Sequence, residues 1–163
     1  MYPTQHVLQK EPYGLRTDER ERISISERPR SVRPRLTGVR TDMAKRVLVA
    51  DDHPLIRKLL CQLFEREEDY DLCAEAENGQ EAIELALKHR PDLIILDFVM
   101  PILNGLEAAR RLKKIMPDVP IILFTQHATG ITLAKPDVII DRVVSKGDPA
   151  SLIENVRSLV PAR

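Results

Sequence analysis

Short apolar runs alternate with longer amphipathic segments along residues 43–163. Unbroken apolar runs are typical of parallel strands that helices cover on both faces. One run, Tyr70–Ala76, alternates apolar and polar residues instead, which predicts an edge strand. The five predicted strands are Arg46–Ala50, Tyr70–Ala76, Leu93–Leu96, Pro120–Phe124 and Val138–Val144.

The segments between the predicted strands have the periodicity of helices. Asn78 and Asn104 each precede a glutamate by three residues, which indicates an N-cap at each asparagine. Pro54 and Pro149 suit a first helical turn, and residues 128–137 form the weakest predicted helix because Gly130 and Pro136 interrupt it. The side chains expected to face the core are Leu55, Ile56, Leu59, Leu60, Leu63, Phe64, Ala82, Ile83, Ala86, Leu87, Leu106, Ala109, Leu112, Met116, Leu152, Ile153, Val156, Leu159 and Val160.

Five strands that alternate with five helices predict an α/β fold, a doubly wound parallel sheet with helices on both faces. The 163 residues suffice for one domain of this kind. No apolar run is long enough to span a membrane, and the N-terminus has no apolar core of a signal peptide. We therefore expect a cytoplasmic protein with no membrane partner.

Residues 1–42 differ in composition from the rest and are predicted to be a disordered basic tail. They contain nine Lys or Arg and six acidic residues, while the whole chain has a formal net charge of zero. An arginine-rich tail could bind nucleic acid or an acidic partner, but a solvated tail is the preferred interpretation, and we expect no nucleic-acid partner. An alternative is that Met43 is the true start and residues 43–163 are the whole protein.

Cysteine, histidine and tyrosine side chains give no further site. Cys61 and Cys73 lie in apolar segments without metal-ligand spacing and are expected to be reduced thiols. His53 and His127 are interpreted as loop or rim residues, and Tyr70 as a packing residue of the edge strand.

Polar residues follow four of the predicted strands: Asp51 and Asp52, then Asp97, Thr125 and Lys146. The carboxyl ends of parallel strands share one edge of a sheet, so these side chains are expected to converge there. Three neighbouring carboxylates repel one another unless a cation compensates them, and oxygen ligands without His or Cys suit Mg²⁺. Carboxylates, Mg²⁺, an ammonium and a hydroxyl together could hold a phosphoryl group, with an aspartate as nucleophile.

Residues 45–161 resemble the CheY-like receiver domains of response regulators in two-component signalling. The resemblance implies a flavodoxin-like sheet with the strand order 2-1-3-4-5, and we expect a stand-alone receiver without an output domain. The matching stretches are Val47–Pro54 (VLVADDHP), Ala76–Gly79 (AENG), Pro91–Pro101 (PDLIILDFVMP) with Gly105, and Pro120–Thr125 (PIILFT) with Ser145-Lys146.

The resemblance also implies the role of each site residue. Asp97 would accept a phosphoryl group from the phosphohistidine of a sensor histidine kinase or phosphotransfer protein. Asp52, Asp97 and the Val99 backbone carbonyl would bind Mg²⁺, and Asp51 would act largely through water. Thr125 and Lys146 would contact the phosphoryl group, after which the domain would signal to a downstream protein target or form a homodimer.

Val143 departs from the receiver pattern, which usually has Tyr or Phe three residues before the lysine. The phosphoryl chemistry is therefore expected to be intact and its readout altered, and an alternative is a constitutive adaptor whose switch is lost. A second alternative is a phosphohydrolase with an aspartyl-phosphate intermediate. Such enzymes commonly carry an acid two residues after the nucleophile, where this chain has Val99, so we expect catalysis only of the domain's own phosphorylation and dephosphorylation.

Overall fold

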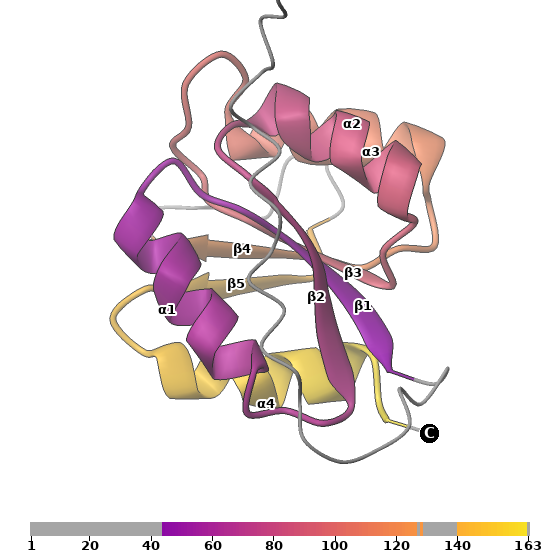
Figure 1. Ribbon diagram of the computed structural model, residues 1–163. Coiled ribbons are helices and arrows are strands. Elements are labelled where there is room, and N and C mark those ends of the chain that lie inside the picture. Colours follow the sequence, from indigo (N-terminus) through magenta and orange to yellow (C-terminus); the bar gives the residue numbers. More distant parts are fainter. Residues whose placement is uncertain (1–43, 127, 129–139, 163) are drawn as a thin grey trace, which may run out of the picture. The chain divides into compact units, whose positions relative to one another are not determined.

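The computed structural model describes residues 44–126, 128 and 140–162. Their five strands form one parallel sheet in the order β2-β1-β3-β4-β5 (Figure 1). This confirms the predicted doubly wound α/β fold and its strand order. The elements are β1 (Lys45–Ala50), α1 (Pro54–Phe64), β2 (Tyr70–Ala76), α2 (Gly79–His89), β3 (Leu93–Leu96), α3 (Gly105–Ile115), β4 (Ile121–Thr125), β5 (Arg142–Ser145) and α4 (Pro149–Leu159).

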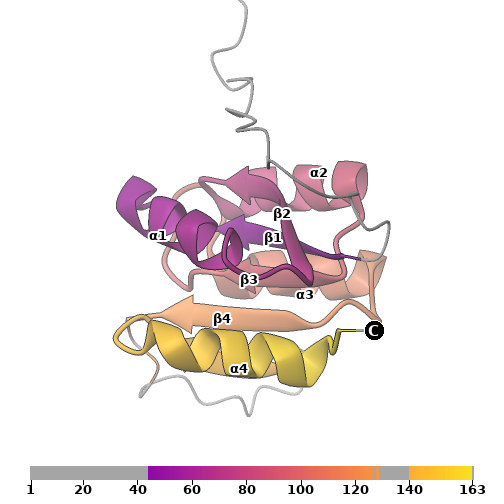
Figure 2. The same ribbon diagram turned by 60° about the horizontal axis from the view of Figure 1, so that its bottom comes forward.

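Helices cover both faces of the sheet. Helices α2 and α3 pack on one face, and α1 and α4 pack on the other (Figures 1 and 2). Successive residues of a strand point to opposite faces, so Val47 and Val49 join the α1–α4 side while Leu48 and Ala50 join the α2–α3 side. The central strands are buried along their whole length, as their unbroken apolar runs predicted.

The edge strand β2 contains a bulge that changes the face to which its side chains point. Val47 pairs with Leu72, but the next residue of β1 pairs with Ala74, so Cys73 is an extra residue in the register. As a result Tyr70 and Leu72 pack with α1 and α4, whereas Ala74 packs with α2 and α3. The alternating pattern of β2 therefore serves two layers of the core.

The predicted helix starts are confirmed by their N-caps. Asn78 Oδ1 accepts a hydrogen bond from the Glu81 backbone N–H at 2.9 Å, and Asn104 Oδ1 accepts one from the Glu107 N–H at 2.9 Å. Asp148 caps α4 in the same way, 3.2 Å from the Ser151 nitrogen. Each cap satisfies a backbone donor that the first helical turn leaves without a helical partner.

The predicted bounds of the last two strands were wrong. Strand β4 begins at Ile121 and includes Thr125, and Ile140 and Asp141 precede β5 instead of belonging to it. Asp141 Oδ2 accepts a hydrogen bond from the Ile121 N–H at 2.8 Å and lies 3.0 Å from Lys113 Nζ. The Asp141 side chain therefore binds the first backbone N–H of β4, just before β5 begins. The predicted helix 128–137 lies outside the described residues except for residue 128.

Three leucines that were predicted to face the core are exposed. Leu55 is 69% exposed, Leu59 41% and Leu87 43%, whereas Leu60 and Phe64 of α1 are buried. In α1 and α2 the apolar stripe of the sequence is therefore wider than the strip of side chains that is buried. The remaining predicted core positions of α3 and α4 face inward as expected.

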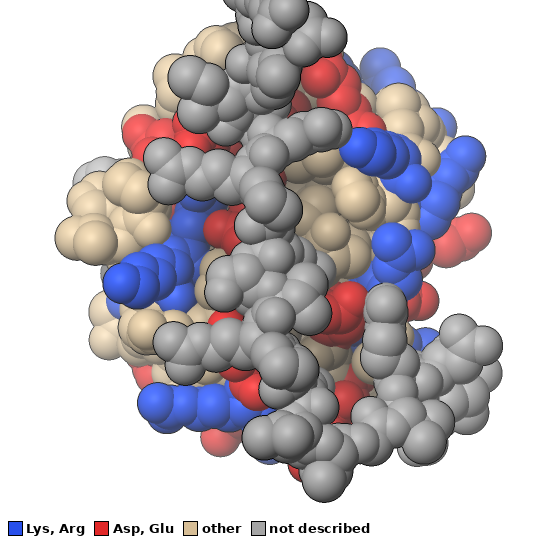
Figure 3. Space-filling view, in the orientation of Figure 1, with Lys and Arg blue, Asp and Glu red and all other residues tan. Residues whose placement is uncertain are grey.

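Several further predictions concern residues away from the sheet edge. Cys61 and Cys73 do not form a disulfide, and Tyr70 is a buried packing residue whose hydroxyl donates to the Val160 carbonyl oxygen at 2.8 Å. Within the described residues, no helix combines the length and apolar character needed to cross a membrane. Basic and acidic described side chains are interspersed on the face drawn in Figure 3. The predicted tail, residues 1–42, and His127 lie outside the described residues.

Candidate phosphoryl-acceptor site

Two buried aspartates stand side by side at the carboxyl edge of the sheet. Asp51 directly follows β1 and Asp97 directly follows β3, and the last residues of these strands, Ala50 and Leu96, are partners in the register. The Asp97 backbone N–H donates to the Ala50 carbonyl oxygen at 2.8 Å. Asp51 is 1% exposed and Asp97 6%. The pairing of two parallel strands therefore places two carboxylates together away from water.

Lys146 follows the edge strand β5, which is separated from β3 by β4, and its side chain reaches both carboxylates. Its Nζ lies 2.7 Å from Asp51 Oδ2 and 2.8 Å from Asp97 Oδ2, and its side chain is only 6% exposed. Thr125, the last residue of β4, is buried, and its carbonyl oxygen accepts a hydrogen bond from the Lys146 backbone N–H at 3.0 Å. The predicted convergence of Asp51, Asp97 and Lys146 is therefore observed, and Thr125 ends its strand at the same edge of the sheet. Contact of the Thr125 hydroxyl with a phosphoryl group remains a prediction.

Burial and ion pairing act against each other at this edge. Burial raises the pKa of the Asp51 carboxyl above its ordinary value, although the bond from Lys146 opposes the shift. For Lys146, burial alone would lower the pKa of the ammonium, but its contacts with Asp51 and Asp97 outweigh burial and raise it. The lysine is therefore charged at neutral pH and compensates part of the negative charge around it.

The carboxylates of Asp51, Asp52 and Asp97 are close enough together to share one divalent cation. Each offers an oxygen, and the three atoms lie within 4.8 Å of one another. Asp51 Oδ2 is buried, and among the described residues it meets Lys146 Nζ in an ion pair at 2.7 Å and has no other polar partner. An oxygen-only donor set of this kind fits a hard ion such as Mg²⁺. The residues present therefore fit the predicted metal.

The remaining oxygens and neighbours of the aspartates have defined contacts. Asp51 Oδ1 accepts a hydrogen bond from the His53 N–H at 2.9 Å, and Asp97 Oδ1 accepts one from the Phe98 N–H at 2.7 Å. His53 precedes α1 and is exposed, as expected for a rim residue. Val99 lies two residues after Asp97 and is 56% exposed. The role of its carbonyl as a metal ligand remains a prediction.

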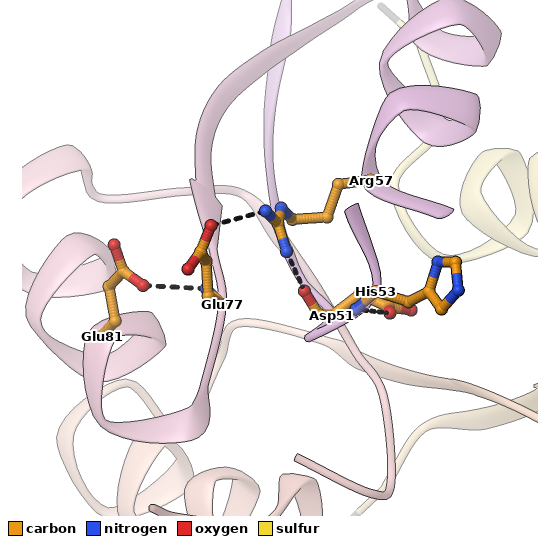
Figure 4. Close-up of polar contacts among 5 residues, drawn as sticks. All are labelled: Asp51, His53, Arg57, Glu77 and Glu81. Atoms are coloured by element: carbon orange, nitrogen blue, oxygen red, sulfur yellow. Dashed lines mark hydrogen bonds and ion pairs between the residues drawn. The ribbon is translucent and has the colours of Figure 1, made fainter. Parts of the chain in front are cut away.

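The residues near the site that sequence reasoning missed are Arg57 and Ile102. Arg57 bonds the backbone of the loop that carries Asp51 (Figure 4). A cation in the first turns of a helix stands at the unfavourable end of the helix dipole, and this signal could have marked Arg57 as a residue with an acidic partner. Ile102 carried no comparable signal.

Ile102 adopts a backbone conformation that isoleucine rarely takes. Its φ is 66°, and the Leu103 N–H donates to the Pro101 carbonyl oxygen at 2.6 Å, which makes Ile102 the centre of a tight turn. A β-branched residue at positive φ is strained, and Ile102 is 82% exposed, so it gains little from packing. The loop after Asp97 therefore contains stored backbone strain.

Replacing Ile102 with glycine is expected to raise the free energy of unfolding by about 1 kcal/mol. Removing the left-handed strain is worth about 1–2 kcal/mol, and the larger conformational entropy of unfolded glycine offsets about half of that. Urea unfolding of the wild type, Ile102→Gly and Ile102→Ala measures the gain, with the alanine variant expected to gain less. Equal or lower stability of the glycine variant would contradict the strain.

Val143, the departure from the usual aromatic residue, is half-buried in β5. It pairs with Leu123 in the register and packs against the core on the α2–α3 side. A valine has no ring that could turn between an inward and an outward position. The altered readout that this substitution suggests remains a prediction.

Comparisons with known proteins agree with this site. The family model of the response regulator receiver domain matches residues 47–157, which is more than half of the chain. The transcriptional regulatory protein PdtaR of Mycobacterium tuberculosis is 37% identical over 135 residues, 78% of this chain and 60% of that protein. The chemotaxis protein CheY of Halobacterium salinarum is 42% identical over 83 residues, 51% of this chain and 68% of that protein.

Solved structures give the same result. The receiver domain of AraT from Geobacillus stearothermophilus has a TM-score of 0.65 and 32% identity, and covers 72% of this chain and 93% of its own. TrrA from Thermotoga maritima, solved in complex with Mg²⁺–BeF, has a TM-score of 0.61 and 36% identity, and covers 71% of this chain and 99% of its own. The chain spans 60% of the length of PdtaR. By fold, family match and the aspartate cluster, the chain belongs to the receiver-domain family of two-component response regulators.

Proposed function

We propose that Asp97 accepts a phosphoryl group from the phosphohistidine of a sensor histidine kinase or phosphotransfer protein. The observation that carries the proposal is the position of Lys146 Nζ, which lies 2.8 Å from Asp97 Oδ2 and 2.7 Å from Asp51 Oδ2. A carboxylate oxygen of Asp52 lies within 4.8 Å of oxygens of these two aspartates. Asp97 is the acid at the centre of this set, because it follows the middle strand of the sheet.

The transfer needs no enzyme activity toward outside substrates. A carboxylate oxygen of Asp97 forms a bond to phosphorus while the P–N bond of the phosphohistidine breaks. The electron pair of that bond stays on the imidazole nitrogen, which takes up a proton. Lys146 and the Thr125 hydroxyl would stabilise negative charge on the phosphoryl oxygens.

Asp51, Asp52, Asp97 and the Val99 carbonyl would hold Mg²⁺ at this site, with Asp51 acting largely through water. When bound, Mg²⁺ supplies the positive charge that lets a phosphoryl group approach a cluster of carboxylates. TrrA, solved in complex with Mg²⁺–BeF, is a relative with 36% identity that supports this assignment. Replacing Asp52 with asparagine, at an exposed position of the set, is expected to weaken Mg²⁺ binding.

Replacing Asp97 with asparagine is expected to abolish phosphoryl transfer, because an amide does not attack phosphorus at an appreciable rate. Radiolabelled phosphate is supplied by a panel of phosphorylated sensor kinases with Mg²⁺, and acid-stable, hydroxylamine-sensitive label on the protein is counted. Asp118→Asn, an exposed acid in the turn before β4, is the matched control and should keep the label. Label that persists on the Asp97→Asn protein would overturn the assignment.

Phosphorylation would act by changing the surface that a downstream protein target recognises. The aspartyl phosphate carries roughly two negative charges where the carboxylate carried one, which is enough to shift a loop between two arrangements. The half-buried Val143 favours a second candidate function, a constitutive adaptor whose surface does not respond. Hydrogen exchange with and without beryllofluoride and Mg²⁺ separates the two, since unchanged exchange around Thr125 and Lys146 would support the adaptor.

A further inference from the structure

The two loops that carry the proposed metal ligands meet a third segment that carries none of them. Asp51 and Asp52 lie between β1 and α1, and Asp97 begins the loop between β3 and α3. The third segment is Glu77–Gly79, which runs from the end of β2 to the first residue of α2, and we call it the brace. It contacts both of the other loops through different residues.

Arg57 joins the brace to the loop of Asp51 and Asp52. Its Nη1 donates to the Asp51 carbonyl oxygen at 2.7 Å, and its Nη2 lies 2.6 Å from Glu77 Oε1. The Arg57 side chain is only 13% exposed, although Glu77 is largely open to water. In Figure 4 the guanidinium lies between these two acceptors, and the imidazole of His53 points away from them.

Gly79 joins the brace to the loop after Asp97. Its backbone N–H donates to the Leu103 carbonyl oxygen at 3.0 Å. A Cβ atom on Gly79 would lie 2.4 Å from that same oxygen, so only glycine permits this approach. The first residue of α2 therefore rests directly on the loop between β3 and α3.

The brace is itself held at the start of α2. Asn78 Oδ1 accepts a hydrogen bond from the Glu81 N–H, and Glu81 Oε2 accepts one from the Glu77 N–H at 2.8 Å (Figure 4). The two bonds run in opposite directions between the helix and the segment before it. These two hydrogen bonds hold the backbone of Glu77, whose carboxylate contacts Arg57.

We propose that Arg57 is a positioning residue that, through the brace, sets the separation between the carboxylates of Asp51 and Asp52 and that of Asp97. The inference rests on the proposed Mg²⁺ site. Mg²⁺ demands near-octahedral geometry, so its affinity responds to small displacements of its ligands. Arg57 holds the main chain of one ligand loop and ties it, by way of Glu77 and Gly79, to the other.

The direction in which substitution of Arg57 changes the Mg²⁺ affinity distinguishes a positioning role from a purely electrostatic effect. Arg57 is positive and close to a cation site, so removing its charge reduces repulsion and, by Coulomb's law alone, tightens Mg²⁺ binding. Loss of positioning has the opposite effect, because residues that orient metal ligands typically contribute tenfold or more to affinity. The direction of the change in the dissociation constant therefore decides between the two.

The test measures the Mg²⁺ dissociation constant of the full chain by titration calorimetry. We expect Arg57→Met to weaken Mg²⁺ binding about tenfold, and Arg57→Lys to weaken it as well, because a single ammonium cannot span both acceptors. Arg157→Met is the matched control, since it removes a comparable ion pair, Arg157 to Glu67 at 2.8 Å, from another part of the domain. Its dissociation constant should equal that of the wild type.

Unchanged or tighter binding by Arg57→Met would overturn the inference, and so would equal weakening by Arg157→Met. If Arg57→Met does not fold, the dissociation constant of Arg57→Lys decides between the two explanations. This variant keeps the positive charge, so a purely electrostatic effect predicts no change in its Mg²⁺ affinity. Failure of the Mg²⁺ site itself is a different result: the wild type would then show no saturable binding, and Asp52→Asn would make no difference.

Discussion

Replacing Lys146 with methionine is expected to lower the free energy of unfolding by about 3 kcal/mol at pH 8, because removing one partner of a buried ion pair leaves uncompensated charge. The lysine is the cation between Asp51 and Asp97, and all three side chains are nearly inaccessible to water. Methionine keeps the length of the side chain and removes its charge, so the loss reports electrostatics more than packing.

The stability that Lys146→Met loses relative to the wild type is expected to become smaller as the pH falls. Burial already raises the pKa of Asp51, and without the ammonium the pKa rises further. The folded variant then holds a proton more tightly than the unfolded chain, so the penalty is complete above the raised pKa and is relieved as the pH falls through it. The stability gap between Lys146→Met and the wild type should therefore narrow between pH 8 and pH 5.

Urea unfolding followed by circular dichroism measures the gap, since the chain has no tryptophan. Lys113→Met is the matched control. Lys113 pairs with the carboxylate of Asp141, where β4 and β5 begin. Added Mg²⁺ is expected to narrow the stability gap between Lys146→Met and the wild type, because it supplies a cation that the variant lacks. The gap between Lys113→Met and the wild type should stay the same, because Mg²⁺ stabilises both of these proteins equally. For Lys146→Met, a gap that is the same at pH 5 and pH 8 would contradict this account of the site.

Replacing Gly105 with alanine is expected to cost about 3 kcal/mol of stability, at the upper end of the usual range for overpacking. The added Cβ would lie 1.9 Å from the Asp97 carbonyl oxygen and 2.9 Å from its carbonyl carbon. Both are backbone atoms of Asp97, the proposed phosphoryl acceptor, and a side-chain rotation cannot move them. Either α3 or the Asp97 backbone must therefore shift.

Gly147→Ala is the matched control for this substitution. Among the described residues, a Cβ on Gly147 would meet Ser145 Oγ alone, at 3.4 Å, which is an ordinary contact. The change in stability is expected to stay within about 0.5 kcal/mol of zero. The same urea titration compares both variants with the wild type, and equal losses for the two would rule out the close approach of α3 to Asp97.

The residues that were predicted correctly are those whose environment is set locally. An unbroken apolar run identifies a covered strand, and an asparagine three residues before a glutamate identifies a helix start. The convergence of Asp51, Asp97 and Lys146 also followed from a simple rule about the ends of parallel strands. The strand order, in contrast, came from the resemblance of the motifs to receiver domains.

The failures concern properties that depend on neighbours distant in the sequence. Leu55 and Leu59 fit a helical stripe, but the width of the contact with the sheet decides which of its members are covered. Asp141 was placed in a strand because it lies within an apolar run, whereas its carboxylate serves Lys113 and the start of β4. Arg57 drew no attention because its acceptors belong to two separate loops.

The bulge at Cys73 has a consequence for how the length of this domain can vary. A deletion of one residue normally turns the rest of a strand inside out, because each later side chain moves to the opposite face. Without Cys73, Leu72 and Ala74 would become consecutive, as their partners Val47 and Leu48 already are. Every remaining side chain would keep its layer, so this position accommodates the loss of a residue that the central strands could not.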